Sequence, residues 1–272
     1  MLALVVGAQT ALAGSANAVA PLRDNVGVVG AQAKPGGGGG GGGGGSSARG
    51  YDISYPQCGG SYPANPAFGI VGINGGKVFS ANPCLASQLA WGGGAAAELY
   101  ANTGNPGPAL SSFWPNGQLA PRFCDPDNPD TADCAYDYGY NAARHSFETA
   151  LQAYQVLGLT TSPAAAQWWL DVETMNSWRD DVTLNVAALE GEVAYLRDVA
   201  GVTRLGFYST TYQWGVITGG TKVFAASPSW GAGARSERAA RNLCTSTTTS
   251  FTGGPLTMVQ FPFSGFDADI RC

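Results

Sequence analysis

The sequence is poor in charged residues and in lysine. Only 12% of its 272 residues are charged, lysine occurs only at positions 34, 77 and 222, and the formal net charge is −5. No basic cluster is present that could neutralise phosphates, so we expect neither a nucleic-acid partner nor binding to a charged membrane surface.

Several catalytic and binding motifs are also missing. His145 is the only histidine, and no G-x-S-x-G segment is present, which argues against a Ser-His-Asp hydrolase. The glycine run at 36–45 is not followed by G-K-[ST], so it is not a phosphate-binding loop. The apolar run near the start is too short to cross a membrane. We therefore expect no cofactor and no membrane span.

The first part of the chain has the composition of targeting and tether segments. Residues 1–20 contain an apolar run followed by small residues, which is typical of a secretory signal, although the usual positive charge at its start is missing. An ordinary alanine-rich helix is the alternative. Residues 21–49 include the glycine run and read as a flexible linker. We expect one folded domain at 50–272 that acts as a monomer.

The even number of cysteines indicates export to an oxidising compartment. No C-x-x-C pair is present, and with a single histidine the spacings do not suit a metal site, so disulfides are the better interpretation. Sequence alone does not fix the pairing, but neighbours along the chain suggest three bonds: Cys58–Cys84, Cys124–Cys134 and Cys244–Cys272.

Periodicity predicts strands that alternate with helices. Such alternation favours a parallel sheet, and seven or eight strands with this length favour a closed α/β barrel of the TIM type, stapled by disulfides. Residues 101–135 are rich in Pro, Gly and Asp and read as an inserted loop. Strands are expected at 50–54, 68–73, 96–100, 167–174, 204–208, 223–230 and 256–261, and helices at 85–91, 136–157 and 184–199.

The segment 167–174 carries the strongest chemical signal. It is an apolar run that ends in Asp171 and Glu173, which share one face because side chains alternate along a strand. Two carboxylates this close cannot both ionise freely, so the pKa of one should rise. Such a pair serves as acid and charge stabiliser in glycosidases, and the short i, i+2 spacing favours retention of configuration. A strand end with two solvated acids is the alternative.

Five short motifs in order resemble glycoside hydrolase family 25, the (β/α)-barrel muramidases. They are Gly50-Tyr51-Asp52-Ile53-Ser54, Leu170-Asp171-Val172-Glu173, Gly206-Phe207-Tyr208-Ser209 with Trp214, Ser229-Trp230-Gly231-Ala232, and Val259-Gln260-Phe261 with Phe266-Asp267-Ala268-Asp269. The sequence departs from that family where substrate would be held, at 73–76, after Tyr100 and at positions 259 and 261 of the W-Q-Y motif.

The resemblance implies a secreted hydrolase of N-acetylated glycans, most specifically of peptidoglycan. In this interpretation Glu173 protonates the glycosidic oxygen, and Asp171 stays ionised and either stabilises the sugar or orients its 2-acetamido group. Substrate contacts are expected from Asp52, Tyr100, Tyr208, Trp230, Gln260 and Asp267, with Trp178 and Trp214 as further stacking candidates. A non-catalytic glycan-binding barrel with the same fold is the alternative.

Overall fold

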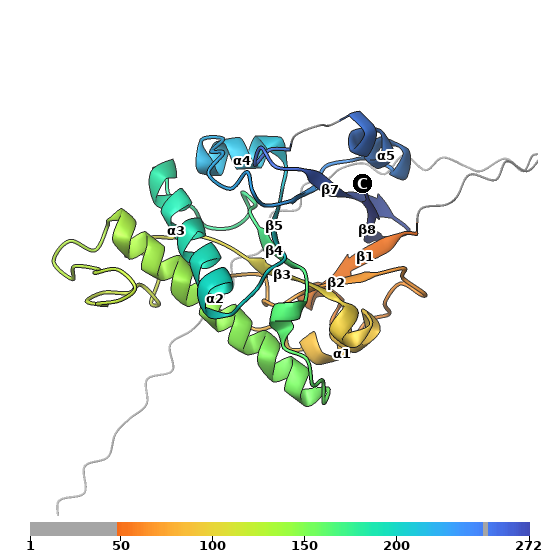
Figure 1. The fold of residues 1–272 in the computed structure, drawn as a ribbon, viewed down its shortest axis with the longest axis horizontal. Coiled ribbons are helices and arrows are strands. Elements are labelled where there is room, and N and C mark those ends of the chain that lie inside the picture. Colours follow the sequence, from red (N-terminus) through yellow and green to blue (C-terminus); the bar gives the residue numbers. More distant parts are fainter. Residues whose placement is uncertain (1–47, 247–249) are drawn as a thin grey trace, which may run out of the picture. The chain divides into compact units, whose positions relative to one another are not determined.

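Strands and helices alternate along most of the chain. The computed structural model describes residues 48–246 and 250–272, so the predicted signal at 1–20 and almost all of the predicted linker at 21–49 lie outside the described residues. Eight strands form a closed barrel in which spatial order follows chain order (Figure 1). The strands are β1 (Gly50–Ile53), β2 (Gly69–Gly72), β3 (Glu98–Asn102), β4 (Trp168–Asp171), β5 (Leu205–Ser209), β6 (Ser229–Gly231), β7 (Leu256–Phe263) and β8 (Phe266–Arg271). The helices are α1 (Leu85–Trp91), α2 (Ala132–Val156), α3 (Val182–Ala194), α4 (Thr211–Thr218) and α5 (Glu237–Ser246). The predicted α/β barrel is confirmed.

The barrel closes through an antiparallel hairpin, so the prediction of a parallel sheet is wrong at this point. Strands β1 to β7 pair in parallel with their neighbours, whereas β8 is antiparallel to both β7 and β1. The turn between β7 and β8 has Ser264 at φ 53° and Gly265 at φ 82°. Two successive left-handed residues are the geometry of a tight hairpin turn. The last strand predicted from the sequence is 256–261, which corresponds to β7, and β8 was not predicted.

Other boundaries differ for local reasons. The strand expected at 223–230 is only β6, because Pro228 precedes it and lacks the N–H that a ladder needs. Phe224 instead packs into the core from a turn, with Ser227 N donating to its carbonyl oxygen. Helix α2 begins four residues before the expected start, at Ala132, because Thr131 caps it by accepting from the backbone N–H of Cys134. Helix α5 was not expected.

The alternation of side chains along the strands separates an apolar cluster inside the barrel from the clusters that lie outside it. Inside the barrel lie Ile70, Trp169, Tyr208, Trp230 and Met258. Outside it, neighbours such as Trp168 and Phe207 pack under the helices, which cover the barrel (Figure 1). Burial of each large apolar side chain contributes about 1.5–3 kcal/mol. The barrel interior is thus filled, and free space begins only at the ends of the strands.

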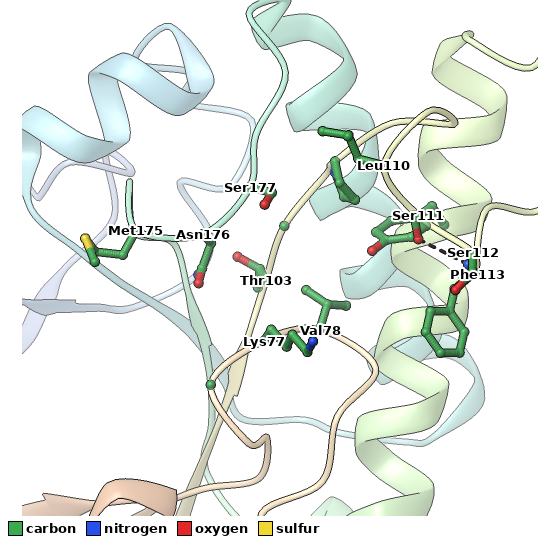
Figure 2. Close-up of a pocket in the computed structure, with 14 residues that line it drawn as sticks. Lys77, Val78, Thr103, Leu110, Ser111, Ser112, Phe113, Met175, Asn176 and Ser177 are labelled. Carbon is green, nitrogen blue, oxygen red and sulfur yellow. Dashed lines mark hydrogen bonds between the residues drawn. The ribbon is translucent and has the colours of Figure 1, made fainter. Parts of the chain in front are cut away.

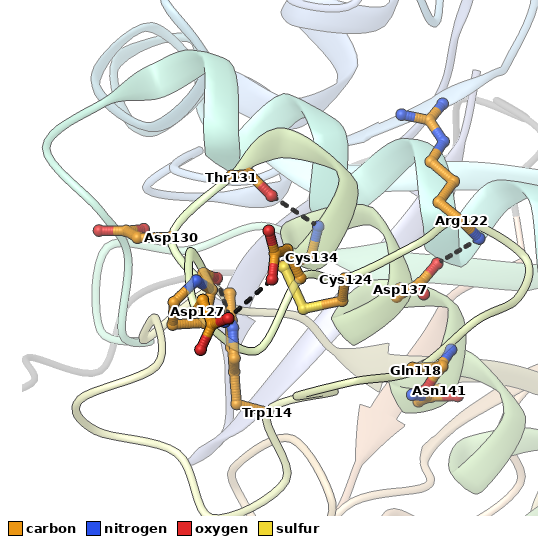
Figure 3. Close-up of a disulfide and its surroundings, with 12 residues drawn as sticks. Trp114, Gln118, Arg122, Cys124, Asp127, Asp130, Thr131, Cys134, Asp137 and Asn141 are labelled. Atoms are coloured by element: carbon orange, nitrogen blue, oxygen red, sulfur yellow. Dashed lines mark hydrogen bonds between the residues drawn. A yellow bond between two sulfur atoms is a disulfide. The ribbon is translucent and has the colours of Figure 1, made fainter.

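The insertion between β3 and α2 is tied to the helices by several contacts. Figure 3 shows the Cys124–Cys134 disulfide at the start of α2. Within the insertion, Trp114 Nε1 donates to the Pro129 carbonyl oxygen at 2.8 Å. The backbone N–H of Arg122 donates to Asp137 of α2 at 3.0 Å. The three predicted disulfide pairings are all present: Cys58–Cys84, Cys124–Cys134 and Cys244–Cys272.

Candidate active site

A pocket of about 140 Å³ opens at the C-terminal ends of the parallel strands. The side chains that line it are the eight residues predicted from the sequence as catalytic or substrate-binding. They are Asp52 (β1), Tyr100 (β3), Asp171 and Glu173 (β4 and the residues after it), Tyr208 (β5), Trp230 (β6), Gln260 (β7) and Asp267 (β8). Residues that were predicted from separate motifs, far apart in the chain, therefore lie around one pocket.

Strand pairing explains why these residues converge. Asp171 is the register partner of Asn102 on β3 and of Tyr208 on β5. Asp52 is the register partner of Asp267 across the antiparallel β1–β8 pair. Directly opposite residues on neighbouring strands have Cβ atoms about 4.5–5.5 Å apart. The carboxylates from the first and last strands are thus adjacent because the barrel closes between them.

The backbone that carries Asp171 and Glu173 is held by side chains from both sides. Thr103 Oγ1 donates to the Asp171 carbonyl oxygen at 2.6 Å, and Ser209 Oγ donates to that of Val172 at 2.7 Å. Trp178 Nε1 donates to the Glu173 carbonyl oxygen at 2.8 Å. Trp178, predicted as a possible stacking residue, therefore fixes the segment after β4 instead. These bonds hold Glu173 in place although it lies two residues beyond the strand.

Asp171 is almost fully buried, and only one of its two carboxyl oxygens has a hydrogen-bond partner among the described residues. Its Oδ2 accepts from Asn102 Nδ2 at 2.7 Å, while its Oδ1 has no partner among the described residues. Burial, with the charges of Glu173 and Asp52, raises the pKa of Asp171 well above its ordinary value, against the opposing bond from Asn102. The pKa of Asp171 is thus raised as well as that of Glu173, and the expectation that Asp171 stays ionised remains a prediction.

Glu173 lies half-buried at the mouth of the same pocket. Burial raises the pKa of Glu173, and the charge of Asp267 adds to this effect, while a hydrogen bond with Gln213 opposes it. A raised pKa keeps a carboxyl group protonated closer to neutral pH, which is what a proton donor requires. Gln213, on α4, is a site residue that the sequence analysis missed.

A hydrogen-bonded chain links the aromatic wall to the first strand. Tyr208 Oη donates to Gln260 Oε1 at 2.8 Å, and Gln260 Nε2 donates to Asp52 Oδ2 at 3.0 Å. Burial and the charge of Asp267 raise the pKa of Asp52 to about 7, although the bond from Gln260 opposes the shift. Asp52 therefore binds a proton over much of the range in which an ordinary aspartate is charged.

Asp269 is a second carboxyl group that the sequence analysis did not assign. It is fully buried, accepts from Trp230 Nε1 at 2.8 Å and shares a hydrogen bond with Asp52. Burial and the charge of Asp52 raise the pKa of Asp269 well above its ordinary value. The signal was available in the sequence, since Asp267 and Asp269 are two residues apart and share one face of β8.

The aromatic side chains form one wall of the pocket. The rings of Tyr208 and Trp230 lie 4.4 Å apart between centroids, and Tyr100 contacts Trp230 edge-on at 6.2 Å. Trp214, the other stacking candidate, is 1% exposed and packs behind β5 against Phe207, so it does not reach the pocket. Tyr100, Tyr208 and Trp230 all line the pocket, but Trp230 is itself 1% exposed, so Tyr100 has the most ring surface open to a ligand and Tyr208 has less.

Other kinds of site find no support in the described part of the chain. Across residues 48–246 and 250–272, no three His, Cys, Asp or Glu side chains are placed to hold a metal ion. Over the same residues, no helix has the length and apolar character needed to cross a bilayer.

Comparisons with known proteins address the fold. No protein-family model matches the sequence, and no curated protein matches it. Among solved structures, a muramidase from Trichobolus zukalii is 18% identical with a TM-score of 0.52, over 83% of this chain and 94% of that one. A family GH25 lysozyme from Aspergillus fumigatus is 15% identical with a TM-score of 0.53, over 84% and 94%. The Clostridium perfringens spore cortex lytic enzyme SleM is 15% identical with a TM-score of 0.50, over 83% and 67%.

The chain has the barrel fold of these lytic enzymes. At 15–18% identity the similarity is one of fold, and it agrees with the family resemblance of the sequence motifs. The pocket carboxylates lie at the C-terminal end of the strands, which is where barrel enzymes have their active sites.

Proposed function

We propose that this protein is a glycoside hydrolase that cleaves N-acetylated glycans, most specifically the glycan strands of peptidoglycan. The observation that carries the proposal is that Asp171 and Glu173 lie in one pocket with the six other predicted residues. Closely spaced carboxyl groups beside aromatic rings are the side chains that glycosidic bond cleavage and sugar stacking require. The fold shared with known muramidases and lysozymes supports the same function.

Glu173 is the proton donor in this proposal. Its half-buried position and raised pKa favour the protonated form, and it lies at the pocket mouth, where a leaving-group oxygen can approach. After the first bond breaks, the resulting carboxylate removes a proton from the attacking water, as microscopic reversibility requires in a retaining mechanism.

Asp171 acts on the sugar that is attacked. A substrate acetamido N–H that donates to the unpartnered Oδ1 would satisfy this buried atom and would favour the ionised form of Asp171. The oriented acetamido oxygen then attacks the anomeric carbon, and the Asp171 carboxylate stabilises the positive charge that develops. The neighbouring bond from Asn102 to Oδ2 keeps the carboxylate in one orientation.

The remaining residues hold the sugar in this scheme. Tyr100 and Tyr208 offer aromatic surface to the apolar side of a pyranose, with the buried Trp230 packed against both, and Asp52, Asp267 and Gln260 offer hydrogen-bonding groups to its hydroxyls. Secretion is part of the proposal, because three disulfides require an oxidising compartment. We propose that the protein works as a monomer.

The test is release of reducing ends from purified peptidoglycan by the wild-type protein and by Glu173→Gln. Glu148→Gln, which changes an exposed glutamate on α2, is the matched control. We expect the wild type and Glu148→Gln to release reducing ends at the same rate. We expect Glu173→Gln to be about 10²–10⁴-fold slower, the usual contribution of general acid catalysis.

The same assay separates hydrolysis from binding alone. If the wild type sediments with peptidoglycan but releases no reducing ends, the protein is the non-catalytic glycan-binding barrel instead. The configuration of the first-formed product, followed by NMR, checks retention independently, because an inverted anomer would exclude the role given to Asp171.

A further inference from the structure

A second pocket lies beside the carboxylate pocket at the same end of the barrel. Its volume is about 290 Å³, and it is formed by the segments that follow β2, β3 and β4 together with part of the insertion. A cavity of this size is at the lower end of the range for small-molecule sites, which suits one short substituent of a larger ligand. Figure 2 shows the side chains around it, with Met175 and Asn176 on one side, Ser111, Ser112 and Phe113 on the other, and Thr103, Lys77 and Val78 between them.

The two pockets share a wall. Glu173 lines the first pocket and Asn176 the second, and the Asn176 N–H donates to the Glu173 carbonyl oxygen at 3.1 Å. The first and last Cα atoms of such a turn lie within about 7 Å of one another. On the neighbouring strand, Asn102 contacts Asp171 and the next residue, Thr103, lines the second pocket. A group attached to a sugar held at Glu173 would therefore be within reach of the second pocket.

The pockets differ in charge. Four carboxyl groups line the first: Asp52, Asp171, Glu173 and Asp267. The described residues that line the second include Lys77 and neither aspartate nor glutamate. Lys77 is exposed, and within the described part of the chain its ammonium group has no acidic partner. A negatively charged part of a substrate finds no cationic side chain among the residues that line the first pocket and is attracted to Lys77 in the second.

The wall made by the insertion combines the apolar Leu110 and Phe113 with Ser111 and Ser112, and contacts with neighbouring segments hold it. Phe113 stacks on Phe79 with centroids 4.4 Å apart and an interplanar angle of 5°. Arg179, after β4, forms a two-pronged ion pair with Asp130 of the insertion at 2.6 and 2.7 Å. Met175 is 90% exposed and leaves apolar surface open at the rim. Preorganised apolar surface of this kind favours binding of small aliphatic groups.

We propose that the second pocket binds the carboxylate-bearing side branch that peptidoglycan carries on its muramic acid sugars. This inference rests on the proposed function. The branch is a lactyl ether, either with a free carboxylate or extended by a short peptide that contains alanine and ends in a carboxylate. Lys77 receives the carboxylate, and Val78, Phe113 and Met175 contact the methyl groups. The insertion thus makes the enzyme selective for branched over unbranched acetylated glycans.

The experiment compares Lys77→Gln with Arg238→Gln, which removes the same charge from an exposed position on α5, beside β7 on another side of the barrel (Figure 1). Steady-state kcat and KM are measured on peptidoglycan with intact peptides and on the same material after an amidase has removed them. The amidase leaves the lactyl carboxylate on the sugar. On intact peptidoglycan we expect Lys77→Gln to raise KM by about two- to fivefold, with kcat unchanged, as for one exposed ion pair.

The stripped substrate identifies the source of the carboxylate. If the increase in KM persists there, Lys77 contacts the lactyl carboxylate, and if it disappears, Lys77 contacts the peptide. Either result supports the pocket assignment. A KM that is unchanged on both substrates, or that Arg238→Gln raises equally, would overturn it.

A binding measurement separates this inference from the proposed function. Sedimentation with insoluble peptidoglycan requires no turnover, and we expect Lys77→Glu to bind less than Arg238→Glu. If binding depends on Lys77 but the wild type hydrolyses nothing, the proposed function is contradicted and the pocket assignment is supported. Equal binding by the two charge-reversal variants would remove the pocket assignment.

Discussion

Buried carboxyl groups at the two ends of the barrel interior differ in whether their oxygens have hydrogen-bond partners. At the N-terminal ends of the parallel strands, Glu98 accepts from Trp169 Nε1 at 2.7 Å and forms an ion pair with Arg271, so both of its oxygens have partners. At the other end, Asp171 keeps one oxygen without a partner among the described residues, and Asp52 has a pKa of about 7. The first arrangement is that of a structural ion pair. The second leaves strongly perturbed acids in an open pocket, which is typical of a functional site.

Removing the paired carboxyl group should have the largest effect on stability. We expect Glu98→Ala to lower the free energy of unfolding by about 1–3 kcal/mol, because it leaves Trp169 Nε1 and Arg271 without their acceptor. Thermal unfolding measures this, and activity of the remaining folded protein should be unchanged. Asp133→Asn, in an exposed pair with Arg122, is the control and should cost less than about 1 kcal/mol. Equal losses in the two variants would contradict the structural role of Glu98.

Neutralising Asp171, which has an unpartnered oxygen, should have the opposite effect on the free energy of unfolding. We expect Asp171→Asn to raise the free energy of unfolding at pH 7 by about 0.5–2 kcal/mol while activity is lost, the usual trade-off at a functional site. An acid whose pKa is raised in the folded state destabilises that state increasingly as pH rises above the unfolded pKa. The gain should therefore shrink at pH 4. If Asp171→Asn instead lowers the free energy of unfolding at pH 7, Asp171 stabilises the fold and the contrast with Glu98 is wrong.

The pH dependence of stability contributed by Asp52 is a third test of the same comparison. Between about pH 4 and 7 the folded protein holds a proton on Asp52 that the unfolded chain releases, so stability falls as pH rises through this window. We expect the melting temperature of the wild type to be higher at pH 5 than at pH 8. Asp52→Asn should reduce that difference by up to about 2–3 kcal/mol, which is the linkage contribution expected between pH 5 and 8 for a pKa of about 7. A wild type that melts at a higher temperature at pH 8 would contradict the raised pKa values.

The sequence predicted the pocket better than it predicted the sheet. Residues that line the pocket occur in short motifs at strand ends, and a closed barrel brings such ends together whatever the exact strand lengths. The antiparallel closure was missed because β7 and β8 are joined by only Ser264 and Gly265, a turn signal that the analysis did not use. Helix α1, by contrast, has the predicted bounds.

The electrostatics of the pocket could not be predicted from the motif alone. The spacing of Asp171 and Glu173 indicated that one pKa would rise, but which one depends on burial and on charges from other strands. Asp52 and Asp269 meet only because β8 pairs with β1. Asn102 and Gln213, which hydrogen-bond the two central carboxyl groups, come from elements without a recognisable motif. Tertiary contacts decide these properties.

The most direct test of the division of roles between Glu173 and Asp171 uses two leaving groups. We would measure kcat/KM of the wild type, Glu173→Gln and Asp171→Asn on peptidoglycan and on an aryl glycoside of an N-acetylated sugar, whose leaving group needs no protonation. Glu173→Gln should lose about 10²–10⁴-fold on peptidoglycan and much less on the aryl glycoside. Asp171→Asn should lose activity on both, because charge stabilisation at the sugar does not depend on the leaving group. Equal losses for both variants on both substrates would contradict the account.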